Sequence, residues 1–196
     1  MENVRQNTGR LALLALFSAI VVVLQLLGMA IRGVFAVSMV GVPIVIGGAL
    51  MGPLAGAWLG LVFGVTVLLS GDAALFLPWN PAATIAIVLL KGILAGLAAG
   101  FIYQLLEKWN RFAAVLAAAV AYPVVNTGVF FLGCMLFLLD DCVQFAAENG
   151  FFASGPVVIA VFYIGFNFFF EVGLDLVLSG VMNRLIQIGQ KTLKKA

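Results

Sequence analysis

The chain consists of long apolar runs separated by short polar or proline-containing breaks. No charged residue lies between Arg32 and Asp72, and the Gly52-Pro53 pair divides this stretch, since such a pair ends one helix and starts another. A helix needs about 20 apolar residues to cross a membrane. The pattern predicts an all-α integral membrane protein with one domain over residues 1–196 and six transmembrane helices, at about 11–31, 37–51, 54–70, 82–106, 112–139 and 156–178.

The breaks between the runs predict loops of different character. Residues 71–81 contain two prolines and Trp79, a residue type that favours the membrane surface. Residues 140–155 predict a polar loop, and the residues after 178 predict a basic tail. The first run is about 20 residues long and has no obvious small-residue cleavage site, so we expect a retained span rather than a signal peptide.

Charged residues divide unevenly between the two sides of a six-span arrangement. Cytoplasmic loops are enriched in lysine and arginine, so the basic side is expected to face the cytoplasm together with both termini. That side collects Arg5, Arg10, Lys108, Arg111, Arg184, Lys191, Lys194 and Lys195, whereas the opposite side collects Arg32, Asp72, Asp140, Asp141 and Glu148.

Composition narrows the chemistry that the chain can perform. Hydrophobic residues make up 64% of it, charged residues 9%, and histidine is absent, which removes the commonest general base and metal ligand. No glycine-rich phosphate loop ending in Lys-Ser or Lys-Thr occurs, so any ATP hydrolysis must come from another protein. Cys134 and Cys142 lack metal-site spacing and can form one disulfide at most; we expect thiols that face the membrane or a loop. We predict no cofactor, no metal and no nucleic-acid partner.

Glycines recur with helical spacing in two of the predicted spans. They are Gly56, Gly60 and Gly64 in the 54–70 run, and Gly92, Gly96 and Gly100 in the 82–106 run. Spacing of i, i+4 and i+8 lines one helix face with small residues and lets two backbones approach closely. We expect tight packing inside the bundle rather than a sliding or oligomeric contact.

Four polar side chains interrupt three of the spans. Lys91 is the only cation between residues 73 and 106, and a charge at bilayer depth costs roughly 2.5–3.5 kcal/mol, so it normally has a partner or a function. Helical rise places Lys91, Asn126 and Asn167 roughly 15–20 Å below the outer surface. Glu171 follows Asn167 by four residues and shares its helix face. These four residues are the predicted polar layer of a substrate-binding site.

Two interpretations of this layer stay open and are compatible. In the first, Lys91 pairs with Glu171 and the asparagines satisfy each other. In the second, the layer is a solute pocket open to the outside, where Lys91 meets a carboxylate or another acceptor. We expect Asp175, a further turn along, to be a helix-end or partner contact, and Gln25 to form a packing hydrogen bond.

Aromatic residues mark the predicted outer rim. Phe76 and Trp79 in one loop, and Phe151 and Phe152 in another, are placed to close over a flat or amphipathic solute. Anchoring at the membrane interface explains Trp79 equally well. We predict Phe76 and Trp79 as substrate-binding residues.

The chain resembles the S component, the substrate-binding membrane subunit, of an energy-coupling factor (ECF) vitamin transporter. Ala15 and Ala19 reproduce the Ala-x-x-x-Ala pattern of that family in the first span, and residues 52–60 are similar to its turn between spans two and three. The resemblance implies that Ala15 and Ala19 face a transmembrane coupling subunit that sits on two cytoplasmic ATPases. It also implies the plasma membrane of a prokaryote, and toppling of the whole subunit to carry an occluded vitamin inward.

The substrate suggested by the resemblance is pantothenate. The stretches 122–128 and 167–171 look most like the branch that includes pantothenate carriers. The riboflavin branch usually has an Asn followed three residues later by Lys in span six, where this chain has Asn167 and Phe170. Riboflavin, a queuosine precursor or another vitamin are the alternatives within the family.

Three other functions, as a secondary carrier, an intramembrane enzyme or a scaffold protein, would make different demands on the sequence. A stand-alone secondary carrier would need coupling-ion ligands, for which Glu171 and Asp175 are candidates. An intramembrane enzyme would need an activated nucleophile, and the serines and threonines of the spans have no histidine base. A scaffold protein would tolerate loss of Lys91 as long as it folds.

Overall fold

The computed structural model describes residues 2–30, 39–165 and 167–195, and this part of the chain contains helices and turns but no strand. The predicted all-α fold is confirmed. The helices are α1 (Glu2–Ala30), α2 (Gly41–Met51), α3 (Pro53–Ser70), α4 (Pro81–Leu106), α5 (Arg111–Phe137), α6 (Leu139–Glu148), α7 (Gly155–Val157), the π-helix η1 (Val158–Ile164) and α8 (Asn167–Lys195).

Four helical segments are long and apolar enough to cross a membrane, and a bent pair makes a fifth. The four are Thr8–Ala30, Pro53–Ser70, Pro81–Leu106 and Arg111–Phe137; the pair is Gly155–Ile164 with Asn167–Thr192. The apolar helix α2 has only 11 residues. The start of the predicted 37–51 span lies outside the described residues, and so does Arg32. The count of six spans therefore stays a prediction.

The predicted polar loop at 140–155 is wrong, and the predicted basic tail is helical. The polar loop at 140–155 contains α6, whose first turn carries Asp140 and Asp141, where acidic side chains favour a helix N-terminus. The basic tail after residue 178 continues α8 to Lys195. The predicted last span is also not one straight helix, because the chain bends by 50° between η1 and α8.

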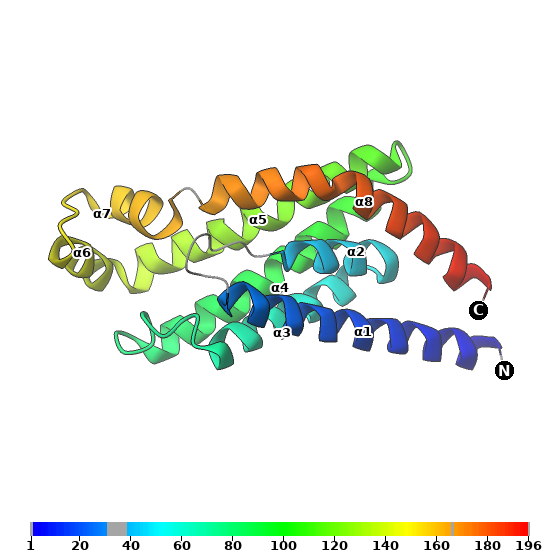
Figure 1. The fold of residues 1–196 in the computed structure, drawn as a ribbon, viewed down its shortest axis with the longest axis horizontal. Coiled ribbons are helices and arrows are strands. Elements are labelled where there is room, and N and C mark those ends of the chain that lie inside the picture. The colour runs from blue at the N-terminus through cyan, green and yellow to red at the C-terminus, as the bar shows by residue number, and fades with distance from the viewer. Residues whose placement is uncertain (1, 31–38, 166, 196) are drawn as a thin grey trace.

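The two ends of the bundle differ in charge. Both termini lie at one end of the molecule together with the turn between α4 and α5, which carries Lys108 (Figure 1). The turns at 71–79 and helix α6, which carry Asp72, Asp140 and Asp141, lie at the other end. The basic end matches the predicted cytoplasmic side, while the orientation in a membrane stays a prediction.

Helices α3 and α4 touch backbone to backbone along the glycine ladders. A Cβ atom on Gly56 would overlap the carbonyl of Gly96, and one on Gly60 would overlap the carbonyl of Gly92. At one end of this contact, a Cβ atom on Gly64 would lie 2.9 Å from the Val88 carbonyl oxygen. The predicted tight packing inside the bundle is confirmed. We call this contact the glycine seam.

Helix α2 is the centre of the bundle although it is short. Eight of its 11 residues are buried, so it is surrounded by protein rather than by lipid. It packs on α3 and α4 at one side and on α5 and α8 at the other. The largest buried cluster joins its Ile44 and Val45 to Leu59, Tyr103 and Tyr122 from these neighbours.

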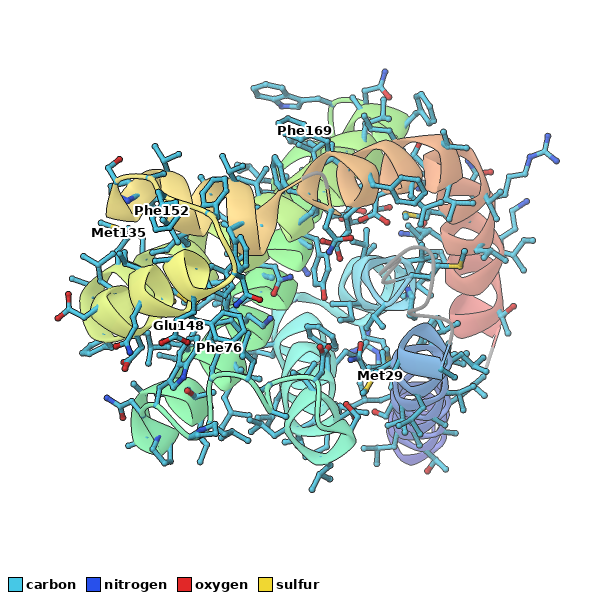
Figure 2. The ribbon with its side chains drawn as sticks, turned by 60° about the vertical axis from the view of Figure 1, so that its left-hand side comes forward. Met29, Phe76, Met135, Glu148, Phe152 and Phe169 are labelled. Carbon is cyan, nitrogen blue, oxygen red and sulfur yellow. The ribbon has the colours of Figure 1, made fainter. Side chains whose placement is uncertain are left out.

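The outward-facing surface is strongly apolar. Phe169 on α8 is 67% exposed and Phe152 before α7 is 81% exposed, and both point away from the bundle (Figure 2). Leu54 and Leu69 on α3 and Leu105 on α4 are exposed in the same way. Exposed apolar side chains all around a helical bundle are typical of a surface that faces lipid.

The glycine seam predicts a specific sensitivity to a single methyl group. We expect Gly96→Ala to lower the melting temperature of the detergent-solubilised protein, because the new Cβ meets the Gly56 carbonyl and overpacking destabilises by about 1–3 kcal/mol. Gly180→Ala is the matched control, since nothing lies within 4 Å of its Cβ position. Equal melting temperatures for both variants would contradict a close backbone contact.

Candidate functional site

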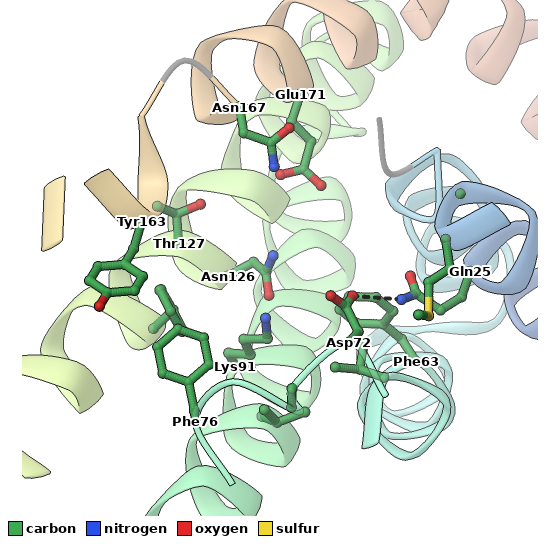
Figure 3. A pocket seen from close by; sticks show the side chains of 16 residues that line it. Gln25, Phe63, Asp72, Phe76, Lys91, Asn126, Thr127, Tyr163, Asn167 and Glu171 are labelled. Carbon is green, nitrogen blue, oxygen red and sulfur yellow. Dashed lines mark hydrogen bonds between the residues drawn. The ribbon is translucent and has the colours of Figure 1, made fainter. Parts of the chain in front are cut away.

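A polar cavity of about 420 Å³ lies among α1, α3, α4, α5, η1 and α8, next to the turns at 71–79 (Figure 3). Its volume falls within the roughly 300–1,000 Å³ of small-molecule sites. Five of the six predicted substrate-binding residues line it. They are Lys91, Asn126, Asn167, Glu171 and Phe76. The four residues of the depth argument, Lys91, Asn126, Asn167 and Glu171, thus border one cavity, while their role in binding stays a prediction.

Lys91 extends into the cavity from α4, one residue before Gly92 of the glycine seam. Its ammonium nitrogen lies 5.2 Å from the centroid of the Phe130 ring and 5.9 Å from that of Phe63. Aromatic faces attract a cation at such distances. The charge is therefore held between α3 and α5 and presented to the cavity.

Asn126 and Glu171 approach the cavity from the other side. Asn126 is 8% exposed on α5, three residues after Pro123, which interrupts the hydrogen bonds of the helix. Glu171 is 9% exposed on α8 and is attracted electrostatically by Lys91. Asn167 and Glu171 lie together on α8, above Asn126 in the view of Figure 3. The cavity thus offers a cation, amides and a carboxylate within one apolar bundle.

Gln25 and Asp72 form a second polar edge. The Gln25 side-chain amide donates a 2.9 Å hydrogen bond to Asp72 Oδ2, and both residues line the cavity (Figure 3). The expected packing role of Gln25 is correct, since the bond ties α1 to the turns at 71–79. The described cavity lining therefore carries one formal positive charge, on Lys91, and two negative charges, on Asp72 and Glu171.

Aromatic rings form one wall of the cavity. The Phe76 ring contacts those of Phe130 and Tyr163, each at 5.5 Å between centroids. Asn80 caps α4 by accepting a 3.1 Å hydrogen bond from the Ala83 N–H, and this fixes the turn that carries Phe76. The rings are inclined to one another, by 82° for Phe76 and Phe130 and by 51° for Phe76 and Tyr163, and they form an apolar wall beside the polar groups.

The bend before α8 shapes this wall. Gly165 has a positive φ of 50°, which glycine adopts readily, and it follows the π-helix η1. Tyr163, before this break, and Asn167, after it, both line the cavity. Tyr163 is anchored because its hydroxyl donates a 3.0 Å hydrogen bond to the Cys142 carbonyl. Short π-helical segments are frequent at functional sites.

Several sequence-based expectations differ from the structure. Trp79 does not line the cavity but packs edge-on against Phe76, with 5.3 Å between ring centroids. Phe151 and Phe152 do not line it either. Asp175 is completely buried, so the expected helix-end or partner contact is wrong; α2 covers this face of α8.

The cysteines require a correction, while the partner-binding role of the first helix stays a prediction. Cys134 and Cys142 are free and fully buried, which overturns the expectation of membrane-facing or loop thiols. Ala15 and Ala19 lie on an exposed face of α1, as a contact with another helix requires. The neighbouring face is held against α3, where the Trp58 indole N–H donates to Ser18 Oγ at 3.2 Å.

Sequence reasoning missed part of the cavity lining. Phe130 lies four residues after Asn126 on α5, so helical spacing alone places both on one face. Phe63 lies between Gly60 and Gly64 of the seam, and this spacing predicts a position beside α4. No sequence pattern indicated that Asp72 and Tyr163 turn inward, because their positions depend on the turns at 71–79 and on the break at Gly165.

Comparison with known protein families identifies the family of the chain. The family model of the ECF transporter substrate-specific component matches residues 9–182 of the 196. The chain belongs to the ECF substrate-specific component family. Neither a curated protein nor a solved structure matches it in the same comparisons.

Membership establishes the general role of the protein. An ECF substrate-specific component is a membrane transport subunit that binds a small solute, and it is not an enzyme. Such components pair with a membrane coupling subunit and ATPases. Among the described residues, no group of three or more cysteine, aspartate or glutamate side chains is placed to hold a metal ion.

Proposed function

We propose that this substrate-specific component captures a small water-soluble vitamin, or a precursor of one, in the cavity around Lys91. The observation that carries the proposal is the gathering of a cation, two carboxylates, amides and aromatic rings around one cavity within an apolar bundle. Buried polar groups within a membrane are expensive and are normally kept for function. The substrate would enter from the end of the molecule that carries the turns at 71–79 and α6.

Pantothenate is the first candidate substrate. Its carboxylate would meet the Lys91 ammonium, and its amide and hydroxyl groups match the side-chain amides of Asn126 and Asn167. Phe76 would cover its apolar part, and Trp79 would act through Phe76, on which it packs. Glu171 would accept a hydrogen bond from a solute hydroxyl. The resemblance of residues 122–128 and 167–171 to the pantothenate branch supports this choice.

Delivery would depend on partner subunits. The exposed face of α1 with Ala15 and Ala19 gives a flat strip against which a helix of the coupling subunit can lie. Two ATPases on the cytoplasmic side would hydrolyse ATP, because the chain has no nucleotide-binding motif of its own. The segregated charges support termini in the cytoplasm on six spans, and the resemblance to ECF transporters supports a prokaryotic plasma membrane.

Replacing Lys91 tests the cavity. We expect Lys91→Ala to weaken pantothenate binding to the purified protein at least tenfold, because a charge-assisted hydrogen bond contributes about 1.5–3 kcal/mol and 1.4 kcal/mol is a factor of ten. Isothermal titration in detergent measures the loss, and gel filtration should show a monodisperse variant. Lys108→Ala, in the exposed turn between α4 and α5, is the matched control. Unchanged affinity in Lys91→Ala would remove Lys91 from the site.

A bulky residue on α1 tests the coupling surface. We expect Ala15→Trp or Ala19→Trp to leave solute binding unchanged and to abolish ATP-dependent uptake in cells that coexpress the coupling subunit and ATPases, because the side chain separates the two helices. Ile20→Trp is the control, because Ile20 is also exposed but helical spacing turns it away from the face that carries Ala15 and Ala19. Loss of binding in the alanine variants would show that the strip packs inside the bundle. Uptake by the wild type without any ATPase module would instead support a stand-alone carrier.

A further inference from the structure

A group of buried oxygen atoms lies next to the cavity but does not belong to its lining. Asp175 on α8 is fully buried, and neither of its carboxylate oxygens has a hydrogen-bond partner in the described part of the chain. Tyr122 on α5 is 1% exposed, and its hydroxyl also lacks a partner there. Buried polar groups are nearly always hydrogen-bonded, so these atoms require an explanation.

Helix α2 closes this group tightly. A Cβ atom on Gly41, the first residue of α2, would lie 2.8 Å from Asp175 Oδ2 and 3.0 Å from Cδ1 of the Tyr122 ring. Both side chains therefore pack around the same point of α2. The close approach leaves little room for an ion with its own coordination shell beside Asp175. A proton needs no such room.

The group is continuous with the cavity along two helices. Glu171 precedes Asp175 by four residues on α8, and Asn126 follows Tyr122 by four residues on α5, so each pair shares a helix face. Glu171 and Asn126 line the cavity, and Asn126 Oδ1 is a further buried oxygen without a partner in the described residues. The four side chains thus lead from the cavity into the protein interior.

The charges around Asp175 disfavour a second anion. Glu171 repels a charged Asp175 through the same helix, and Tyr122 faces it from α5. Helix α2 carries no titratable side chain, and Lys91 on α4 attracts Glu171 across the cavity. A carboxylate anion that is buried without hydrogen bonds is strongly unfavourable, whereas a carboxylic acid has both a donor and an acceptor.

We propose that Asp175 is a proton-binding site, occupied while Glu171 carries the negative charge that faces the cavity. The proton comes from solvent and forms an O–H bond on one carboxylate oxygen of Asp175. The neutral acid removes the repulsion between the two carboxylates and leaves Lys91 opposite a single anion on α8. The site lies outside the cavity lining, and the proposal holds whether or not the solute is pantothenate.

Infrared spectroscopy of the whole protein tests the proposal without any solute. Protein is produced with aspartate labelled by carbon-13 at the side-chain carboxyl, purified in detergent and measured at pH 7. The chain has four aspartates, and the other three, Asp72, Asp140 and Asp141, are not fully buried. We expect one C=O band of a protonated carboxylic acid that shifts with the aspartate label. It should disappear in Asp175→Asn and persist in Asp140→Asn and Glu171→Gln.

Two results would overturn the site. One is a spectrum at pH 7 without a label-sensitive carboxylic acid band, which would mean that Asp175 is ionised and stabilised by internal water. The other is such a band that survives in Asp175→Asn, which would place the proton elsewhere. Labelling of the wild type already distinguishes aspartate from glutamate, so the test remains decisive if Asp175→Asn fails to fold.

Discussion

The contact between α3 and α4 determines where the functional groups of this protein lie. Each glycine of the seam faces backbone of the opposite helix, so neither helix can shift along the other without a clash. Lys91 adjoins Gly92, and Phe63 lies between Gly60 and Gly64. The seam therefore holds the lysine beside an aromatic face at the edge of the cavity. Close helix packing without large side chains is the usual solution where lipid provides no hydrophobic driving force between helices.

Polar groups inside the bundle are concentrated in one place. Lys91, Asp72 and Glu171 provide the charges of the cavity, and Gln25 and Asn126 provide amides. Outside the cavity lining, the buried polar or charged side chains among the described residues are Thr66, Thr84, Asp175 and Ser179, and the outer surface is apolar. This distribution suits a protein that must remain stable in a membrane and yet receive a polar solute, because most of its inward-facing charges and amides border one cavity and only Asp175 lies beyond its lining.

The sequence predicted the cavity better than the elements around it. Periodic glycines and the depth of polar residues within helical runs depend only on helix geometry, so the seam and four polar residues of the cavity lining, Lys91, Asn126, Asn167 and Glu171, followed from them. The break at Gly165 was not predictable, because the run from 156 to 166 is uniformly apolar. Helix α6 is short and polar and looked like a loop. The burial of Asp175 depends on α2, whose position no local pattern reveals.

The central claim is that the cavity around Lys91 holds the transported solute, and mass spectrometry of small molecules that copurify with the protein tests it most directly. The wild type should retain a small molecule with a carboxylate or another strong hydrogen-bond acceptor, and the same molecule should be depleted in Lys91→Ala prepared in parallel. Equal retention by both proteins, or a retained molecule without any such acceptor, would contradict the claim.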